Sequence, residues 1–247
     1  MTLIAAHRGG ADLWPENSPT AFRNTARLPV EFVEFDVHTS RDGALVVHHD
    51  ATLDRMTDKT GAIADLPLAE VKAAAIRGAN GEAPPTLDEL IQIFKPTGID
   101  LRLEIKLDAR MAHYPAIESR IAAALHAADM LERTLVSAFS LDSLIRFRAA
   151  ATAGHGLLWL IAPPTFRHIG GIDGAVRNAK ALDIPEIVPR VQDVSGDALK
   201  AAEAAGLKLG AYAVNDRGAI RRMLDLGVSS FTTDRPDWAL AERAKRA

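Results

Sequence analysis

The 247-residue sequence contains no cysteine. Disulfide bonds and thiolate metal sites are therefore excluded, so a metal ion bound by this chain must use oxygen or imidazole ligands. The lack of cysteine also agrees with a reducing compartment. The first residues, MTLIAAHRGG, lack the positively charged region and the apolar stretch of a signal peptide. We expect a cytoplasmic protein.

Long apolar runs and an excess of positive charge are also missing. No uninterrupted apolar stretch reaches the roughly 18 residues that span a bilayer, so we expect no membrane segment. The net charge is −3, from 29 basic and 32 acidic residues, and the basic residues are scattered along the chain. Nucleic-acid binding usually requires a strongly basic face, so nucleic acid is not an expected partner. Aromatic residues make up 5% of the chain, and they indicate no oligomeric state.

Short apolar or β-branched runs alternate with alanine-rich helical segments along the whole chain. Stretches such as 87–94, 117–128 and 197–205 are predicted as helices. Residues that cap helices well stand before several helix starts: Thr86 before LDEL, Ser140 before LDSL and Ser195 before GDALKAAEAAG. Eight runs are predicted as strands: Leu3–Arg8, Phe32–Val37, Leu101–Lys106, Thr134–Phe139, Gly156–Ile161, Glu186–Arg190, Lys208–Val214 and Ser229–Asp234.

This alternation indicates parallel strands that are joined by crossover helices. Eight repeats favour a closed (β/α)₈ TIM barrel, which typically takes roughly 250 residues, so residues 1–247 are expected to form one domain. An open doubly wound sheet is the alternative, because the number of elements does not establish closure.

An additional strand-like run, 44–48, follows the second strand too closely for a crossover helix. Arg41-Asp42-Gly43 separates the two runs, and Asp-Gly is a hairpin signal. If Ser40 pairs with Gly43, Glu34 stands opposite His49. Residues 50–85 are rich in turn-forming residues and are expected to be an insertion over one barrel end, with a short helix near 68–76.

Acidic side chains mark two neighbouring strands. Glu34 and Asp36 are two residues apart and point the same way on a strand, and Glu104 repeats the pattern in LRLEIK. Three acids in an apolar interior require a compensating cation. Oxygen ligands favour Mg²⁺, Ca²⁺ or Mn²⁺. Structural pairing with Arg8 and Lys106 is the alternative.

Two histidines lie at strand ends close to these acids. His7 and His49 are candidates for a general acid and a general base, whereas the adjacent His48 is expected to point to the opposite side. Arg8 and Lys106 supply positive charge that suits a phosphate group. The residues therefore indicate metal-assisted phosphoryl chemistry.

The motifs that carry these residues resemble those of the glycerophosphodiester phosphodiesterase family. They occur in family order along the chain: HRGG…PEN (7–17), VEFDVHTSRDGALVVHHDATLDRMT (33–57), PTLDEL (85–90), LEIK (103–106), VSAFS (136–140) and TTDRPD (232–237). The chain departs from the family pattern in having Ser18 after PEN, where threonine is usual. Tyr212 stands where tryptophan is common, which weakens any inference about specificity.

The resemblance implies an enzyme with a role for each of these residues. Glu34, Asp36 and Glu104 would hold one divalent ion, and His7 and His49 would be the acid/base pair. Arg8 and Lys106 would bind the phosphate, Tyr212 would stack on the substrate, and Glu16 with Asn17 would order the site. The expected reaction cleaves a small glycerophosphodiester to glycerol 3-phosphate and an alcohol. The glycerol 2-hydroxyl is the nucleophile that the resemblance suggests, and water is the alternative.

Two other functions remain open. A lysophospholipase D type of enzyme could use the same barrel and metal ligands, but it would require an exposed apolar or basic surface, and no sequence segment indicates one. A barrel that binds phosphate without catalysis is the other alternative. The presence of every expected acid, base and metal ligand argues against it.

Overall fold

The strands form a nearly closed parallel barrel in the computed structural model, which describes residues 1–151 and 156–246. Strand order around the barrel is β8-β7-β6-β5-β4-β2-β1-β9, and β3 pairs only with β2. The strand bounds are Leu3–Ala6 (β1), Phe32–Thr39 (β2), Leu45–Val47 (β3), Asp100–Ile105 (β4), Thr134–Ala138 (β5), Leu157–Ile161 (β6), Glu186–Pro189 (β7), Lys208–Leu209 (β8) and Ser230–Thr233 (β9).

Backbone hydrogen bonds close the ring between the last two barrel segments. The Ala211 amide donates to the Ser230 carbonyl, and the Thr232 amide donates to the Ala211 carbonyl, each at 3.0 Å. These bonds exclude the open sheet, although β8 itself ends at Leu209, five residues before the predicted Val214. Ala213 has a φ of 59°, which a regular strand does not allow.

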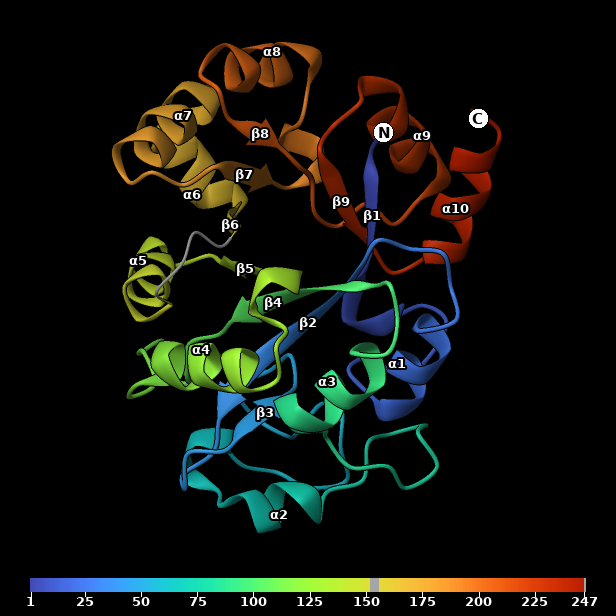
Figure 1. Cartoon of the computed structure of the whole chain (residues 1–247), viewed down its shortest axis with the longest axis vertical. Helices are drawn as coiled ribbons and strands as arrows, with labels where there is room; N and C mark the ends of the chain where they lie inside the picture. The colour runs from blue at the N-terminus through green and yellow to red at the C-terminus, as the bar shows by residue number, and fades with distance from the viewer. Residues whose placement is uncertain (152–155, 247) are drawn as a thin grey trace.

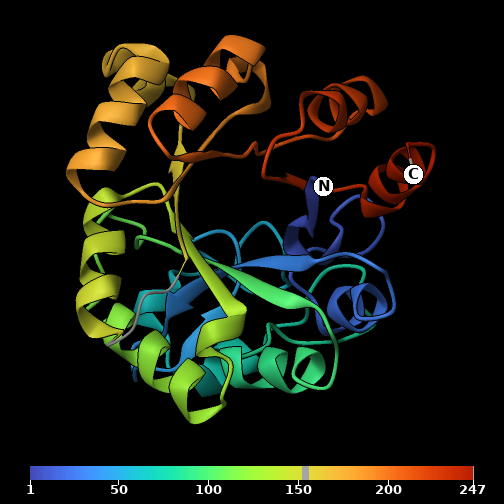
Figure 2. The ribbon, with the colours of Figure 1, turned by 45° about the horizontal axis from the view of Figure 1, so that its top comes forward.

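Helices surround the barrel, as Figure 2 shows. Each crossover contains at least one, and two occur between β6 and β7. Their bounds are Pro19–Thr25 (α1), Leu68–Lys72 (α2), Leu87–Phe94 (α3), Ile117–Ala127 (α4), Leu141–Ala150 (α5), Pro163–His168 (α6), Gly171–Ala181 (α7), Gly196–Ala204 (α8), Arg217–Leu226 (α9) and Pro236–Ala244 (α10).

Helix α3 illustrates how the sequence specifies these elements. Thr86 caps the helix by accepting a hydrogen bond from the Glu89 amide, while the Glu89 carboxylate accepts one from the Thr86 amide. The helix then buries a stripe at intervals of three and four residues, comprising Leu87, Leu90, Ile91 and Phe94. This periodicity matches one face of an α-helix, so the stripe packs against the barrel.

Alternation along β2 separates the apolar core from the barrel interior. Val33, Phe35 and Val37 belong to the main apolar core, and the Phe35 ring packs edge-on against Phe22 of α1. Glu34 and Asp36 therefore point to the opposite face, into the barrel. The predicted inward direction of both acids is confirmed.

The hairpin formed by β2 and β3 differs from the predicted register by one residue. Val37 pairs with Val47, and the Ser40 amide donates to the Ala44 carbonyl. The turn thus has three residues rather than two, and Gly43 at its end has the left-handed φ of 87° that such turns use. The prediction that Glu34 stands opposite His49 is wrong, because regular pairing ends at Val47 before His49 is reached.

The residues between β3 and α3 lie beside the barrel, next to the hairpin, as α2 and β3 do in Figure 1. They contain a short 3₁₀ turn, Ile63–Asp65, and α2, which is shorter than the predicted helix. Leu53, Ile63 and Val71 form a small separate core with Val46 of β3. Across the described residues, no helix combines the length and apolar character that spanning a bilayer requires.

Candidate active site

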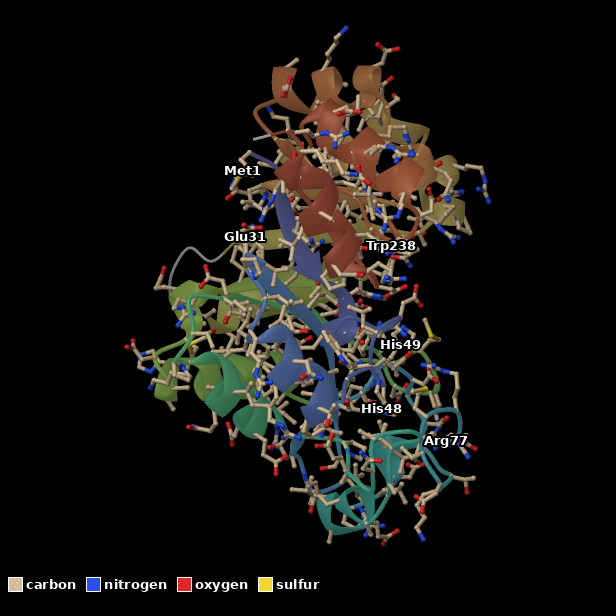
Figure 3. The ribbon with its side chains drawn as sticks, turned by 90° about the vertical axis from the view of Figure 1, so that its right-hand side faces the viewer. Met1, Glu31, His48, His49, Arg77 and Trp238 are labelled. Atoms are coloured by element: carbon tan, nitrogen blue, oxygen red, sulfur yellow. The ribbon has the colours of Figure 1, made fainter. Side chains whose placement is uncertain are left out.

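The predicted site residues meet in a cavity of about 230 Å³ at the carboxyl ends of the barrel strands. Figure 3 shows His48 and His49 on the same side of the molecule as Trp238, whereas Met1 and Glu31, which precede β1 and β2, lie on the opposite side. We term this space the central cavity, and it is lined by His7, Arg8, Glu34, His49, Arg102, Glu104, Lys106, Ser137, Phe139, Leu160, Arg190, Tyr212, Ala213 and Thr232.

Three carboxylates gather at one wall of this cavity. Glu34, Asp36 and Glu104 are all buried, and each offers an oxygen that lies within 4.8 Å of the others. The barrel register brings them together, because Asp36 on β2 pairs directly with Glu104 on β4. Such a set of hard oxygen ligands suits a divalent cation.

Two cations contact these acids. The Lys106 ammonium lies 2.6 Å from a Glu104 oxygen and 3.0 Å from an Asp36 oxygen, and the Arg8 guanidinium lies 3.5 Å from Asp36. The structural pairing considered from the sequence is therefore present. Among the described residues Glu34 has no Lys or Arg ion pair; its ion-pair contact is the His7 Nε2 atom at 3.9 Å, and the buried Arg102 also interacts with it electrostatically.

The pKa shifts identify Glu34 as the acid whose ionised form is disfavoured. Burial and the neighbouring Asp36 carboxylate raise the pKa of Glu34 to about 7. Burial also disfavours the charged form of Asp36, but Lys106 and Arg8 outweigh it and hold the pKa of that carboxyl well below its usual range. The acidic trio fits a divalent cation, because an added cation would stabilise the ionised form of Glu34.

Asp234 and Asn215 hold the imidazole of His7. The His7 Nδ1 atom is hydrogen-bonded to Asp234, and the Asn215 amide group donates to the other oxygen of the same carboxylate. The His7 Nε2 atom lies 3.9 Å from Glu34. Burial lowers the pKa of His7, but Glu34 and Asp234 together raise it above its ordinary value.

His49 has a matching arrangement on the other side of the acids. Its Nδ1 atom lies 2.6 Å from an Asp50 oxygen, and its backbone carbonyl lies 3.1 Å from Nε2 of the buried His38. Burial, with Lys106 and Arg8, lowers the pKa of His49, although Asp36 opposes them. The two imidazoles are thus shifted in opposite directions.

Arg55, from the segment between β3 and α3, connects both sides of the site. Its Nε atom donates to Asp50 at 2.6 Å, and its Nη2 atom donates to Glu16 at 2.6 Å. Glu16 in turn accepts a hydrogen bond from Arg8 at 3.0 Å. One guanidinium therefore fixes the carboxylate that holds His49 and the carboxylate that holds Arg8.

The remaining predicted residues lie where they can support the site. The Asn17 amide group donates to Asp36 at 2.8 Å, and the Ser18 hydroxyl caps α1, which explains how serine can replace the usual threonine. Tyr212 lines the cavity edge-on to Phe139. His48 turns away from the cavity and its Nε2 atom lies 3.2 Å from the Thr52 carbonyl.

The sequence analysis did not identify Arg102, Asp234, Asp50 or Arg55 as site residues. Arg102 lies on the cavity side of β4, and its alternation with Glu104 was a usable signal. Asp234 and Asp50 were given no role, because their partners come from distant or irregular segments. Arg55 lies in a turn-rich segment where no periodicity indicates the direction of a side chain.

Comparison with known proteins finds a family model and relatives that match nearly the whole chain. The model of the glycerophosphoryl diester phosphodiesterase family matches residues 7–238. A glycerophosphodiester phosphodiesterase from Caldanaerobacter subterraneus subsp. tengcongensis is 29% identical over 96% of this chain and 95% of its own length.

Solved structures extend the likeness to the fold. A protein from Agrobacterium tumefaciens, assigned provisionally as a glycerophosphoryl diester phosphodiesterase, is 39% identical, with a TM-score of 0.96 over 100% of this chain and 98% of its own. A phosphodiesterase from Oleispira antarctica, solved with its product sn-glycerol-3-phosphate, is 23% identical, with a TM-score of 0.81 over 99% of this chain and 97% of its own. At that identity the second likeness shows the fold alone.

The Arg55 contacts predict a loss of activity when this side chain is shortened. We expect Arg55→Gln to lower kcat by about 10- to 100-fold, because Asp50 and Glu16 both lose the hydrogen bonds that Arg55 donates. The size of this effect is comparable to that of removing residues that orient metal ligands. KM should change much less, since Arg55 does not line the cavity. Steady-state kinetics on a glycerophosphodiester measure both constants.

Arg77→Gln is the matched control. Arg77 lies in the same segment and on the same side of the molecule (Figure 3), and within residues 1–151 and 156–246 its side chain has no ion pair. Equal kcat values for the two variants would contradict the role assigned to Arg55.

Proposed function

The chain belongs to the glycerophosphoryl diester phosphodiesterase family, and from this premise we propose that it hydrolyses glycerophosphodiesters to glycerol 3-phosphate and an alcohol. Glycerophosphocholine and glycerophosphoethanolamine are representative substrates. The observation that carries the proposal is the convergence of three buried carboxylates and two oppositely shifted histidines on one cavity. The cytoplasmic location expected from the sequence stays a prediction.

Glu34, Asp36 and Glu104 are proposed to hold one divalent cation, with Mg²⁺ or Ca²⁺ favoured and Mn²⁺ as a further choice. The closeness of the three carboxylate oxygens and the raised pKa of Glu34 support this assignment. When bound, such an ion lowers the pKa of an attacking hydroxyl and neutralises charge that builds on the phosphoryl oxygens.

The two histidines are proposed to exchange protons with the substrate. His49, whose pKa is lowered, accepts the proton of the attacking hydroxyl, and His7, whose pKa is raised, donates a proton to the departing alcohol oxygen. In each ring Nδ1 is hydrogen-bonded to an aspartate, so Nε2 is the atom available for transfer. The roles reverse in a second step.

Arg8 and Lys106 are proposed to bind the phosphate. Both line the central cavity and both also touch the acids, so they can bridge the metal ligands and the substrate phosphate. The fork of an arginine side chain is suited to two phosphate oxygens. Tyr212 is proposed to pack against the glycerol or its substituent, while Glu16 and Asn17 orient Arg8 and Asp36.

The attacking group is proposed to be the 2-hydroxyl of the substrate glycerol. An attached hydroxyl is already close to phosphorus, which gives a large effective concentration. It forms a new P–O bond while the bond to the departing alcohol breaks, and the cyclic phosphate then takes up water.

Release of glycerol 3-phosphate from glycerophosphocholine tests the proposed function. We expect turnover with a divalent ion, none in chelator, and loss of turnover in Glu34→Ala, Asp36→Ala and Glu104→Ala. His7→Ala and His49→Ala should lose about 10²–10⁴ in rate with metal binding largely intact. His48→Ala is the control and should lose far less, because this ring faces away from the cavity. Near-normal turnover of the carboxylate variants in chelator would contradict the metal assignment.

A phosphodiester of propane-1,3-diol, which lacks the 2-hydroxyl, tests the nucleophile. Its turnover should collapse under the cyclic route, while it still competes with glycerophosphocholine for the site. Rapid hydrolysis of this substrate would identify water as the nucleophile instead.

A further inference from the structure

The backbone of the proposed base His49 leaves the sheet shortly after β3. Beyond the paired residues of β2 and β3, the His48 amide still donates to the Asp36 carbonyl at 3.0 Å. In the part of the chain that the structure describes, no backbone amide donates to the carbonyl of His49. The position that carries a proposed proton-transfer group therefore lacks the main-chain bond that a strand neighbour would give it.

A side chain supplies the missing bond. The Nε2 atom of His38 lies 3.1 Å from the His49 carbonyl oxygen, and a carbonyl only accepts hydrogen bonds, so the ring donates from Nε2. His38 follows Asp36 by two residues on β2, so both side chains point to the same face of the strand. The strand that carries two of the proposed metal ligands thus also holds the backbone of His49.

Tyr114 occupies the other nitrogen of this ring. Its hydroxyl oxygen lies 2.8 Å from His38 Nδ1, and the two rings pack edge-on with their centroids 5.7 Å apart. A buried imidazole between two uncharged partners is most stable in its neutral form, which has one N–H. Because Nε2 carries that hydrogen, Nδ1 accepts one from Tyr114. Burial raises the pKa of Tyr114, so its hydroxyl keeps the proton that it donates.

His38 and Tyr114 are placed to act on the site indirectly. Both are buried, and neither lines the central cavity. Each ring nitrogen of His38 is already hydrogen-bonded, so this ring has no atom left for proton exchange with a substrate. A buried polar chain whose members are all hydrogen-bonded fixes one arrangement of the groups that it joins. The group at the end of this chain is the backbone of His49.

We propose that His38 is a positioning residue for His49, and that Tyr114 fixes the tautomer in which His38 acts. This inference rests on the proposed function, in which His49 accepts the proton of the attacking hydroxyl. Asp50 holds the imidazole of His49 at Nδ1. His38 holds the backbone of the same residue from β2. The two contacts together direct Nε2 of His49 towards the central cavity.

His38→Leu and His38→Gln form the matched pair of variants. Leucine cannot donate a hydrogen bond, so His49 should shift, and we expect kcat for glycerophosphocholine to fall about 10- to 100-fold, as small displacements of reacting groups do. KM should change little, because His38 does not line the central cavity. Glutamine can donate to the carbonyl from its amide group, so His38→Gln should recover most of the loss. A merely structural role would lower stability and leave kcat per folded molecule unchanged.

Tyr114→Phe tests the tautomer. Without the hydroxyl, the His38 ring can carry its hydrogen on either nitrogen, and we expect kcat to fall about 2- to 10-fold, the worth of one hydrogen bond. In the His38→Gln background the same change should have no further effect on kcat, because glutamine has no tautomers. His113→Leu is the control. This residue precedes Tyr114, but its ring contacts Asp142 of α5, so the variant should leave kcat unchanged.

The outcomes separate this inference from the proposed function. If the wild type hydrolyses glycerophosphocholine but His38→Leu keeps its kcat, or His38→Gln loses as much as His38→Leu, the positioning inference is wrong and the proposed function stands. Should His38→Leu not fold, Tyr114→Phe decides, and a wild-type kcat or an equal loss in the His38→Gln background would overturn the inference.

Nuclear magnetic resonance of the His49 ring gives a readout that does not depend on turnover. The Nδ1 proton of His49, which is hydrogen-bonded to Asp50, should exchange with water faster in His38→Leu than in the wild type or His38→Gln. If the wild type hydrolyses no glycerophosphodiester, the proposed function fails and these exchange rates decide the positioning of His49. Faster exchange in His38→Leu alone would support it, and equal rates in all three proteins would overturn it.

Discussion

The burial of three carboxylates in one barrel is the constraint on which the rest of the site depends. Glu34, Asp36 and Glu104 lie within a few ångströms of one another, where like charges repel strongly and water is scarce. Lys106 and Arg8 form ion pairs with Asp36 and Glu104, whereas burial and the neighbouring Asp36 raise the pKa of Glu34. A divalent cation would favour the ionised form of Glu34, which is why we propose a cation site here.

Successive ion pairs extend outward from this centre. Asp36 is paired with Arg8, Arg8 with Glu16, and Glu16 with Arg55, which also holds Asp50 beside His49. The series runs from the fully buried Asp36 to Arg55, which is 47% exposed, so its outer end adds no further buried charge. The segment between β3 and α3 therefore supplies the guanidinium that links Asp50, beside the proposed base His49, to Glu16, the partner of the proposed phosphate ligand Arg8.

Much of this arrangement could be predicted from the sequence because it follows from periodicity. Alternation on β2 placed Glu34 and Asp36 inside the barrel, and the strand–helix repeat predicted its architecture. The hairpin register could not be fixed in this way, since a three-residue turn and a two-residue turn fit the same letters. The hollow lined by Met111 and Phe139 could not be predicted from the sequence either, because the two residues come from separate segments that only the fold brings together.

The raised pKa of Glu34 can be tested as a dependence of protein stability on pH. The pKa of Glu34 is about 7 in the folded protein and 4.5 in the reference state, so the folded state binds this proton more tightly. Its stabilising contribution is complete below pH 4.5 and is lost as the pH rises through 7. Chemical unfolding of metal-free protein between pH 5 and 8.5 tests this, with Glu34→Gln as the variant and the exposed Glu70→Gln as the control.

We expect the metal-free wild-type protein to lose up to about 3 kcal/mol of unfolding free energy across this range. Glu34→Gln should remove most of this loss and leave the part that follows from the pKa of His7, which Asp234 also raises, and a divalent ion should restore stability to the wild type alone. A wild-type profile that matches Glu34→Gln at every pH, with no response to a divalent ion, would contradict this prediction.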